Sequence, residues 1–590
     1  MEVLKVFSPL PFKDKVTKLT GQLLFSCKEM DQDRSCKGSE VRIGHSLNEA
    51  ERQHLARRIK TVLHCLKQNG IYCSEDELPN IAVLGSGGGL RAMIALLGSL
   101  SQLKEDKLLD CIMYLCGVSG STWCMASLYK ELDWSTKLKT VKENIVQRLA
   151  EGSVNWSQMG LKLAKYYSEK DNFSLTDVWA ALIVSHMVKE IDEHRISEQR
   201  GNYTNDPYPI YTVIDKQCKY DRLNADVWFE ITPDESGYSL SGAFVDSSCL
   251  RSQFENGQKI KDQPETDMLY LQGLCGSAFA DMEEILKLLY EALKHLIKNK
   301  IGSTEESQTS QTPDVQNGCE VLLTLVDLNL CMLKKEDPKI YLQTMKNLLK
   351  DKHDEAEQMT LHLERLMTSE GKIPEAELKD YTLHLCSSIS DMFKVQGFLD
   401  KIWIAIVKAI EKMVHWIWGT TYDYLYKMKV EDVDPSVLDS KTREYEDAGA
   451  LLNSPYFSVL RQERDIDLII SVDCNGLKPF ETVVQTAELC KELKIPFPEV
   501  AIPPEGKEPQ DFYVFRGYSK APTVIHIPLF NAVNCKGEVL EWMKRYHTFR
   551  MDYSHSEITD LLDKAGLNIK NNKEKLLKEI ENVIKEKKMK

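Results

Sequence analysis

A serine lies between two glycines where the sequence changes from a strand pattern to a helix pattern. The run Gly117-Val118-Ser119-Gly120-Ser121 follows the apolar stretch CIMYLC and leads into STWCMASLYKEL. A nucleophilic serine must project from a sharp strand-to-helix turn, which requires small neighbours, and the start of the following helix favours developing negative charge. The pattern predicts that Ser119 is a nucleophile. A tight turn with a serine N-cap is the alternative that the motif alone leaves open.

A second glycine-rich turn, Gly85-Ser86-Gly87-Gly88-Gly89, joins the apolar run IAVL to the helical stretch LRAMIALLGSLSQL. Its backbone N–H groups at a helix N-terminus form an anion site and could serve as an oxyanion hole beside Ser119. A dinucleotide loop is the competing interpretation, because G-x-G-x-x-A fits loosely from Gly87, yet the next strand ends without the carboxylate that holds a ribose. No Gly-Lys-Ser/Thr follows, which argues against a phosphate loop.

Two charged residues complete a candidate site. Arg91 falls in the first turn of the predicted helix, where a cation is misplaced unless it has an anionic partner such as a phosphate, although an ordinary salt bridge is the alternative. The serine also needs a base. Asp447, in Tyr445-Glu446-Asp447-Ala448-Gly449, is a carboxylate just before the strand pattern IDLIISVD. A turn-forming aspartate is the alternative for this position.

Two strand–turn–helix units in succession predict a parallel sheet of the α/β class. An amphipathic helix is expected before them, over residues 47–69 and ended by Gly70. The strand pattern returns later in the chain. We expect strands at 466–473, 512–515 and 524–527, with a helix at 480–493.

The middle of the chain has a different pattern, helical and rich in charge. We interpret it as a helical cap inserted into the α/β domain at about 282–430. Within it, residues 303–318 are rich in Ser, Thr, Gln and Glu and predict a flexible linker. Residues 1–44 show no periodicity and are expected to form an N-terminal arm or an extra surface strand, which leaves 45–590 as one domain.

Composition narrows the class of protein. The chain has 590 residues and is 43% hydrophobic, so it can bury a large core. A net charge of −14 argues against a general nucleic-acid binder. The start lacks a signal-peptide pattern, and no long apolar run predicts a membrane span. The 16 cysteines include no CxxC pair, which favours reduced cytosolic thiols over a disulfide framework or zinc site.

The motifs together resemble one family, the cytosolic phospholipase A2 enzymes. The resemblance runs over residues 45–585 and rests on GSGGGLRAM, GVSGSTW, PYPIYTVID, WFEITPDESGYSLSGAFVDSS, LQGLCGSAF, WGTTYDYLY, DAGALLNSPYF and DLIISVD in this order. It implies a patatin-like catalytic domain of the α/β class, with a central, mostly parallel sheet flanked by helices and a helical cap insertion.

The resemblance also implies roles for individual residues. Ser119 is the nucleophile and Asp447 its base, in a dyad without histidine. Gly88 and Gly89 form the oxyanion hole, and Arg91 holds the phosphate of the phospholipid. Arg464 matches an arginine that the family uses near the mouth of the active site. No metal and no cofactor are expected.

The implied activity is that of a Ca²⁺-independent phospholipase A2 and lysophospholipase, which passes through an acyl-serine and becomes a transacylase when a second lipid accepts the acyl group. The chain is most similar to the gamma type, because no Ca²⁺-binding β-sandwich fits ahead of residue 45. Its partners would be phospholipid, lysophospholipid and a transient membrane surface, with no nucleic acid and with self-assembly left open. A cytoplasmic location with peripheral attachment to intracellular membranes is expected. The C-terminal KEKKMK is not a prenylation box, so no lipid anchor is expected.

Two features keep alternatives open. Glu446 stands where the family usually has an apolar residue, and Ala450 replaces a leucine. A carboxylate facing inward there would raise the pKa of Asp447, whereas one facing solvent would change little. A lipid-binding scaffold that has lost catalysis is therefore the alternative function. In the cap, Trp403, Trp416 and Trp418 suit an apolar rim at a membrane, with packing inside the protein as the other interpretation.

Overall fold

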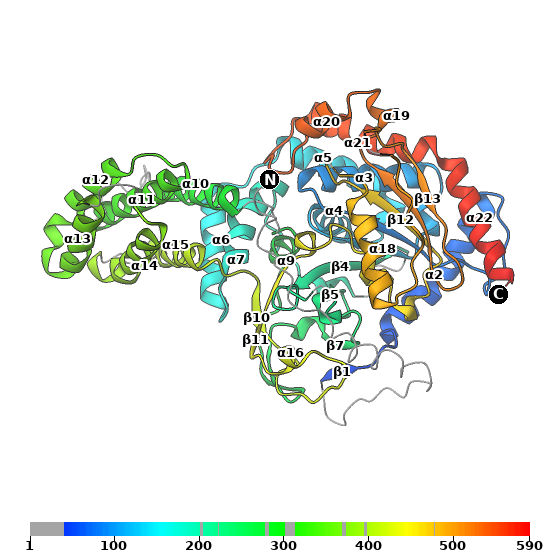
Figure 1. Ribbon diagram of the computed structural model, residues 1–590, viewed down its shortest axis with the longest axis horizontal. Coiled ribbons are helices and arrows are strands. Elements are labelled where there is room, and N and C mark those ends of the chain that lie inside the picture. The colour runs from blue at the N-terminus through cyan, green and yellow to red at the C-terminus, as the bar shows by residue number, and fades with distance from the viewer. Residues whose placement is uncertain are drawn as a thin grey trace.

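The computed structural model describes residues 40–200, 205–221, 223–277, 282–300, 313–368, 373–393, 398–476, 478–504 and 506–589. Figure 1 shows a sheet flanked by helices and, beside it, a lobe of helices that projects away from the sheet. The α/β class is therefore confirmed, and the lobe occupies the place of the expected cap.

The described residues contain a twelve-stranded sheet, in the order β1-β7-β6-β5-β4-β3-β2-β12-β14-β13, with β11 against β4 and β10 against β11. The strands are β1 (Val41–Ile43), β2 (Ile81–Gly85), β3 (Tyr114–Gly117), β4 (Tyr208–Asp215), β5 (Trp228–Ile231), β6 (Glu235–Tyr238), β7 (Ala243–Asp246), β10 (Thr420–Tyr422), β11 (Thr442–Asp447), β12 (Leu468–Asp473), β13 (Tyr513–Phe515) and β14 (Thr523–Pro528). A separate hairpin pairs β8 (Gln253–Glu255) with β9 (Gln258–Lys261).

The sheet is mixed, whereas a mostly parallel one was expected. Only the central strands β4, β3, β2, β12 and β14 pair in parallel. Strands β4 to β7 pair antiparallel. The reason lies in the connections, because β5, β6 and β7 follow one another through short loops, and parallel pairing needs a long crossover. The buried central strands are apolar on both faces, as parallel strands covered by helices require.

The helices next to the site follow the predicted pattern. Helix α2 (Glu49–Gln68) precedes β2, α3 (Leu90–Glu105) follows β2, α4 (Gly120–Tyr129) follows β3, and α18 (Glu481–Leu493) follows β12. Further helices of the core are α5 (Leu138–Glu151), α6 (Trp156–Glu169), α7 (Leu175–Trp179), α8 (Ser185–Val188), α9 (Met268–Cys275), α16 (Pro435–Leu438), α17 (Tyr456–Val459), α19 (Ala532–Cys535), α20 (Val539–Arg545), α21 (His555–Asn571) and α22 (Lys573–Met589). Helix α3 is buried nearly all round between the sheet and α21.

The cap lobe consists of α10 (Met282–Lys300), α11 (Pro313–Leu333), α12 (Lys339–Leu349), α13 (His353–Thr368), α14 (Glu375–Met392) and α15 (Phe398–His415). The helical part ends at His415, and Thr420 already begins a strand of the sheet, ahead of the expected limit near 430. Of the linker expected at 303–318, residues 303–312 lie outside the described residues, and the chain is helical from Pro313. Of the expected arm, residues 1–39 lie outside them, while Val41–Ile43 pairs with β7.

The tryptophans of the cap pack inside the protein. For Trp403 and Trp418 the packing interpretation is therefore confirmed and the membrane rim is wrong. Trp403 is buried and lies against α11, where a Cβ at Gly318 would stand 2.8 Å from its ring. Trp418 is buried edge-on to Trp179, with ring centroids 6.3 Å apart. Trp416 is half-buried against Trp418. None of the described helices combines the length and the apolar character needed to cross a bilayer.

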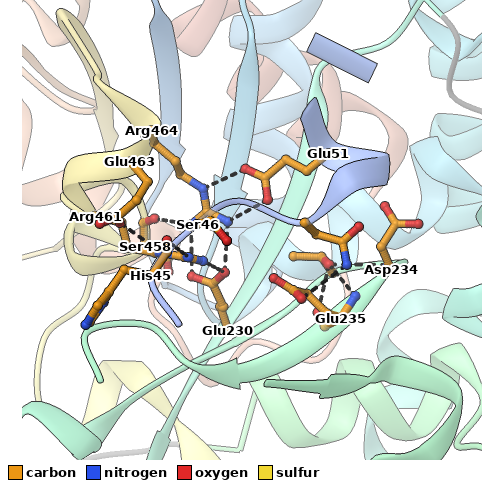
Figure 2. Close-up of polar contacts among 12 residues, drawn as sticks. His45, Ser46, Glu51, Glu230, Asp234, Glu235, Ser458, Arg461, Glu463 and Arg464 are labelled. Carbon is orange, nitrogen blue, oxygen red and sulfur yellow. Dashed lines mark hydrogen bonds and ion pairs between the residues drawn. The ribbon is translucent and has the colours of Figure 1, made fainter. Parts of the chain in front are cut away.

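A buried cluster of charges joins α2, β5 and the segment before β12 (Figure 2). Arg464 donates from Nε to Glu51 Oε1 at 2.9 Å and from Nη2 to Glu230 Oε1 at 2.8 Å. Arg461 donates from Nη1 to the same Glu230 oxygen at 2.8 Å. The expectation that Arg464 stands at the mouth of the site is wrong, because its partners are carboxylates inside the core and its side chain is 0% exposed.

The two arginines hold Glu230 ionised. Burial acts to raise the pKa of Glu230, but the charges of Arg464 and Arg461 outweigh it and lower that pKa to about 2. The pKa of a glutamate side chain in an unfolded chain is about 4.3. The ionised glutamate therefore stabilises the fold above about pH 4, and this contribution is lost as the pH falls toward about 2.

We expect the substitution Glu230→Gln to lower the free energy of unfolding by about 3–5 kcal/mol, because it leaves two buried guanidinium groups short of a counter-charge. Urea denaturation at pH 7 measures the change. The matched control is Glu463→Gln, since Glu463 is partly exposed and lies 3.8 Å from Arg461 Nε. Equal stabilities of the two variants would contradict the expectation.

Candidate active site

Strands β3 and β11 share one edge of β4, and this brings two distant parts of the chain together. Gly117 of β3 pairs with Tyr211, and Asp447 of β11 pairs with Val213. The other edge of β4 is occupied by β5 over Tyr211 to Ile214. Because β11 runs antiparallel to β4, its C-terminal end faces the C-terminal end of β3, two residues or ~7 Å away along β4. The register therefore places Asp447 beside the turn that carries Ser119.

Ser119 occupies a strained turn at the start of α4. Its backbone has φ 51° and ψ −132°, a conformation that a residue with a side chain rarely adopts. The backbone N–H of Ser119 donates to Cys275 O at 3.0 Å. A Cβ at Gly120 would lie 1.9 Å from Gly89 O, and one at Gly117 would lie 2.6 Å from a methionine sulfur. A side chain at position 120 would collide with the backbone of the glycine loop, whereas one at position 117 would require the methionine to move. The turn therefore favours small residues on both sides of Ser119, as the sequence pattern predicted for a nucleophile.

The glycine loop lies directly beside this turn, because Gly85 pairs with Gly117 across β2 and β3. Ser121 Oγ donates to Ser86 O at 2.6 Å and so ties the loop to the first turn of α4. Gly88 and Gly89 have φ of 149° and 60°. Glycine adopts such positive φ values readily, whereas residues with a side chain rarely do.

A cavity of about 720 Å³ opens at this point. Four of the predicted site residues line it, namely Gly88, Arg91, Ser119 and Asp447. Its other walls are formed by Gly449, Leu451, Asn453, Asn475, Gly476, Lys478, Glu481, Thr482, Gln485, Met543, Lys544, His547, Thr548 and Phe549. Gly89, which lies against Gly120, and Arg464 are not among the lining residues.

Arg91 is a buried cation with uncharged partners. Its guanidinium donates to Cys474 O at 3.0 Å, to Tyr546 O at 2.6 Å and to Thr548 Oγ1 at 3.4 Å. Burial lowers the pKa of Arg91 from its ordinary value. No carboxylate in the described part of the chain lies within ion-pair distance of it. A buried guanidinium that lines a cavity and has no carboxylate at ion-pair distance among the described residues favours an anionic ligand.

Glu446 points away from Asp447. Burial alternates along β11, with Asp447 buried on one face and Glu446 partly exposed on the other. Glu446 forms an ion pair with Lys219 on its own face. Asp447 Oδ1 accepts a hydrogen bond from Gly449 N at 2.7 Å. Of the two arrangements considered from the sequence, the inward-facing carboxylate is therefore wrong.

The sequence reasoning missed Asn453 as a site residue. Asn453 lines the cavity and is joined to the glycine loop twice, since Gly87 N donates to its carbonyl at 3.2 Å and its Nδ2 donates to Gly87 O at 3.3 Å. It lies in the same motif as Asp447, DAGALLNSPYF. The only sign in the sequence was that Asn453 is a polar residue shortly after Asp447. Its distance along the chain from the glycine loop gave no indication that the two are in contact.

Comparison with known proteins decides the family. Residues 81–317 match a family model described as the lysophospholipase catalytic domain. Cytosolic phospholipase A2 gamma of Mus musculus is 34% identical over 561 residues, which cover 91% of each chain. The Homo sapiens counterpart is 32% identical over 576 residues, 92% of this chain and 96% of that protein. The chain belongs to the cytosolic phospholipase A2 family. It is thus an enzyme of the phospholipase A2 type, and it is similar to the gamma members over most of its length.

Solved structures of this phospholipase family share the fold. Human GIVD cytosolic phospholipase A2 has a TM-score of 0.62 at 20% identity, over 93% of this chain and 69% of that one. The same human protein in complex with methyl gamma-linolenyl fluorophosphonate has a TM-score of 0.59 at 21% identity, over 95% and 67% of the two chains. The patatin-like catalytic fold expected from the motifs is confirmed.

The charges of the site come from the chain itself. Arg91 and the N-terminus of α4 supply positive potential at the cavity, and Asp447 supplies the negative group. Within the described ranges, no group of three or more His, Cys, Asp or Glu side chains is arranged to hold a metal ion.

We expect Gly120→Ala to lower the rate at which a fluorophosphonate probe labels Ser119 by about 100-fold, because the new Cβ would push the glycine loop away from the serine turn. Intact-protein mass spectrometry over time measures the labelling. Glu446→Gln is the matched control, since its side chain lies on the opposite face of β11, and it should label at the wild-type rate. Wild-type labelling of the alanine variant would contradict the expectation.

Proposed function

We propose that this phospholipase is a Ca²⁺-independent phospholipase A2 and lysophospholipase that cleaves acyl esters of glycerophospholipids through a Ser119–Asp447 dyad. One observation carries the proposal. A single cavity is lined by Ser119, Asp447, Gly88 and Arg91, which together can act as nucleophile, base, oxyanion donor and phosphate partner. The lipid substrates follow from the names of the relatives and from the buried cation at the cavity wall.

Ser119, Asp447 and the glycine loop can carry out the reaction in two steps. Asp447 takes the proton of Ser119 Oγ as that oxygen attacks the ester carbonyl, and the amides of Gly88 and Gly89 stabilise the oxyanion. The lysophospholipid leaves with the proton that Asp447 returns, and the acyl group stays on Ser119. Water, deprotonated by Asp447, then attacks the acyl group and releases the fatty acid, and Asp447 returns the proton to Ser119 Oγ. A second lipid that takes the place of water gives transacylation.

The arrangement favours a working enzyme over a lipid-binding scaffold. The scaffold hypothesis rests on a disturbed environment of Asp447, but Glu446 faces Lys219 on the other side of the strand. Meanwhile Asp447 keeps its hydrogen bond from Gly449 and the adjoining loop keeps its contacts to Gly87. The proposed base is thus held in place independently of its unusual neighbour.

We further propose a cytoplasmic location with transient, peripheral contact with intracellular membranes. The relatives are named cytosolic phospholipases, and every cysteine that the structure describes is a free thiol, as expected in a reducing compartment. The substrate lies in a bilayer, so the contact must last long enough for a lipid to enter the cavity.

We expect Ser119→Ala and Asp447→Asn to lower fatty-acid release from phospholipid vesicles by about 10⁴-fold or more, because each removes one half of the reacting pair. Release is measured by mass spectrometry with a Ca²⁺ chelator present, and wild-type release should persist in the chelator. Ser168→Ala, an exposed serine on α6, is the control and should keep wild-type activity. Normal release of fatty acid by the Ser119 variant would show that Ser119 is not the nucleophile. Loss of release by the wild-type protein in the chelator would contradict Ca²⁺ independence.

We expect Arg91→Gln to lower kcat/KM for phospholipid about 10- to 100-fold, the effect of losing a charged hydrogen bond to phosphate. An uncharged aryl ester without phosphate should be hydrolysed with little change, because it makes no such contact. Steady-state kinetics on both substrates gives the comparison. Equal losses on both esters would show that Arg91 acts only through the structure of the cavity wall.

A further inference from the structure

The turn after β12 contacts both the glycine loop and Arg91. Ser86 Oγ donates to Asp473 Oδ1 at 3.3 Å, and Cys474 N donates to the same Ser86 Oγ at 2.6 Å. The carbonyl of Cys474 accepts from Arg91 Nε at 3.0 Å. Asn475, the next residue, lines the cavity and donates its backbone N–H to Asp473 Oδ1 at 2.8 Å. The Asp473 carboxylate is therefore the acceptor around which this turn is built.

Ser86 extends the connection to the nucleophile. Its backbone N–H donates to Val472 O at 3.2 Å, and its carbonyl accepts from Ser121 Oγ at 2.6 Å. Ser121 lies in the first turn of α4, two residues after Ser119. A continuous chain of contacts thus runs from Asp473 through Ser86 to the helix that carries the serine turn, across the ends of β12, β2 and β3.

We propose that Asp473 is a positioning residue for the phospholipase reaction: through Ser86 and the turn at Cys474 it holds the glycine loop and Arg91 in place against Ser119. The inference rests on the proposed function and adds a residue to it. Asp473 is 2% exposed and is not among the residues that line the cavity, so it acts through its neighbours.

The surroundings of Asp473 make its charge sensitive to pH. Burial raises the pKa of Asp473 to about 7, while the hydrogen bonds from Asn475 and Ser86 and the charge of Arg91 oppose that rise. His526 of β14 faces the other oxygen, with Nε2 at 3.5 Å from Oδ2, and burial lowers the pKa of His526 to about 4, so it is neutral at pH 7. The further titratable groups around Asp473 are Tyr456 of α17 and the Cys474 thiol, and burial raises the pKa of each, so both stay protonated.

Ionisation strengthens the contacts on which the positioning depends. A carboxylate accepts the Ser86 and Asn475 hydrogen bonds more strongly than a neutral carboxyl group does. As the pH rises through about 7, Asp473 loses its proton and the turn is held more firmly. The rate of Ser119 labelling should therefore rise over the same interval.

The test compares two substitutions by the rate of Ser119 labelling with a fluorophosphonate, from pH 5.5 to 8.5. Asp473→Asn keeps an oxygen for both hydrogen bonds but cannot ionise, so the wild-type inflection near pH 7 should be absent. Asp473→Ala removes the acceptor and should label about 100-fold more slowly. The double variant S86A/D473A should be no slower than D473A, because both changes break one connection.

Controls separate this inference from the proposed function. Asp465→Asn, an exposed carboxylate just before the same strand, should keep the wild-type rate and pH profile. Rates are normalised to the fraction of protein that the probe finally labels, so loss of folded protein alone leaves them unchanged. If the alanine variant does not fold, the pH profile of the asparagine variant decides. A wild type that is labelled at Ser119 and releases fatty acid, beside a D473N variant that keeps the inflection, overturns the role of Asp473 and leaves the proposed function intact.

Discussion

The site depends on the hydrogen-bond register of one strand edge. Along β4, the backbone of β3 ends at Tyr211 and that of β11 ends at Val213. Side chains alternate between faces along a strand, so a slip of β11 by one residue would turn Asp447 toward the face on which Glu446 now meets Lys219. Backbone pairing of a buried strand therefore sets the position of the carboxylate, and the contacts of the loop that follows refine it.

The buried charge cluster also helps to position the site, because it holds the segment that follows Asp447 and Asn453. Burying Arg464, Glu51 and Glu230 costs desolvation energy, and the attraction between their charges roughly offsets this cost. The cluster therefore fixes one arrangement of the chain more than it adds net stability. The cluster ties the segment that follows Asn453 to α2 and β5. Because Asn453 in turn holds Gly87, a network far from the cavity helps to define the geometry of the glycine loop.

Features governed by local sequence could be predicted, and features governed by distant partners could not. The turns at Ser119 and Gly88 were expected from small residues between a strand and a helix, and α2, α18, β12 and β14 follow from periodicity alone. Arg464 was misplaced because its sequence neighbours give no sign of Glu51 and Glu230, which come from other elements. For Trp403 and Trp418 the sequence left a membrane rim open beside packing in the core, and only the contacts with α11 and Trp179 decide for the core. The antiparallel strands β5 to β7 were not predicted, because their sequence was used only as a motif of the family and was not analysed for strand patterns.

The route of the chain between the two halves of the site has a consequence for biosynthesis. The strand–turn–helix units around Ser119 are built from neighbouring residues, whereas β11 follows the whole cap lobe in the sequence. Domains generally fold as units, and during synthesis the N-terminal ones fold first. Ser119 and Asp447 belong to one α/β domain, so the cavity that both residues line cannot form until β11 has been synthesised.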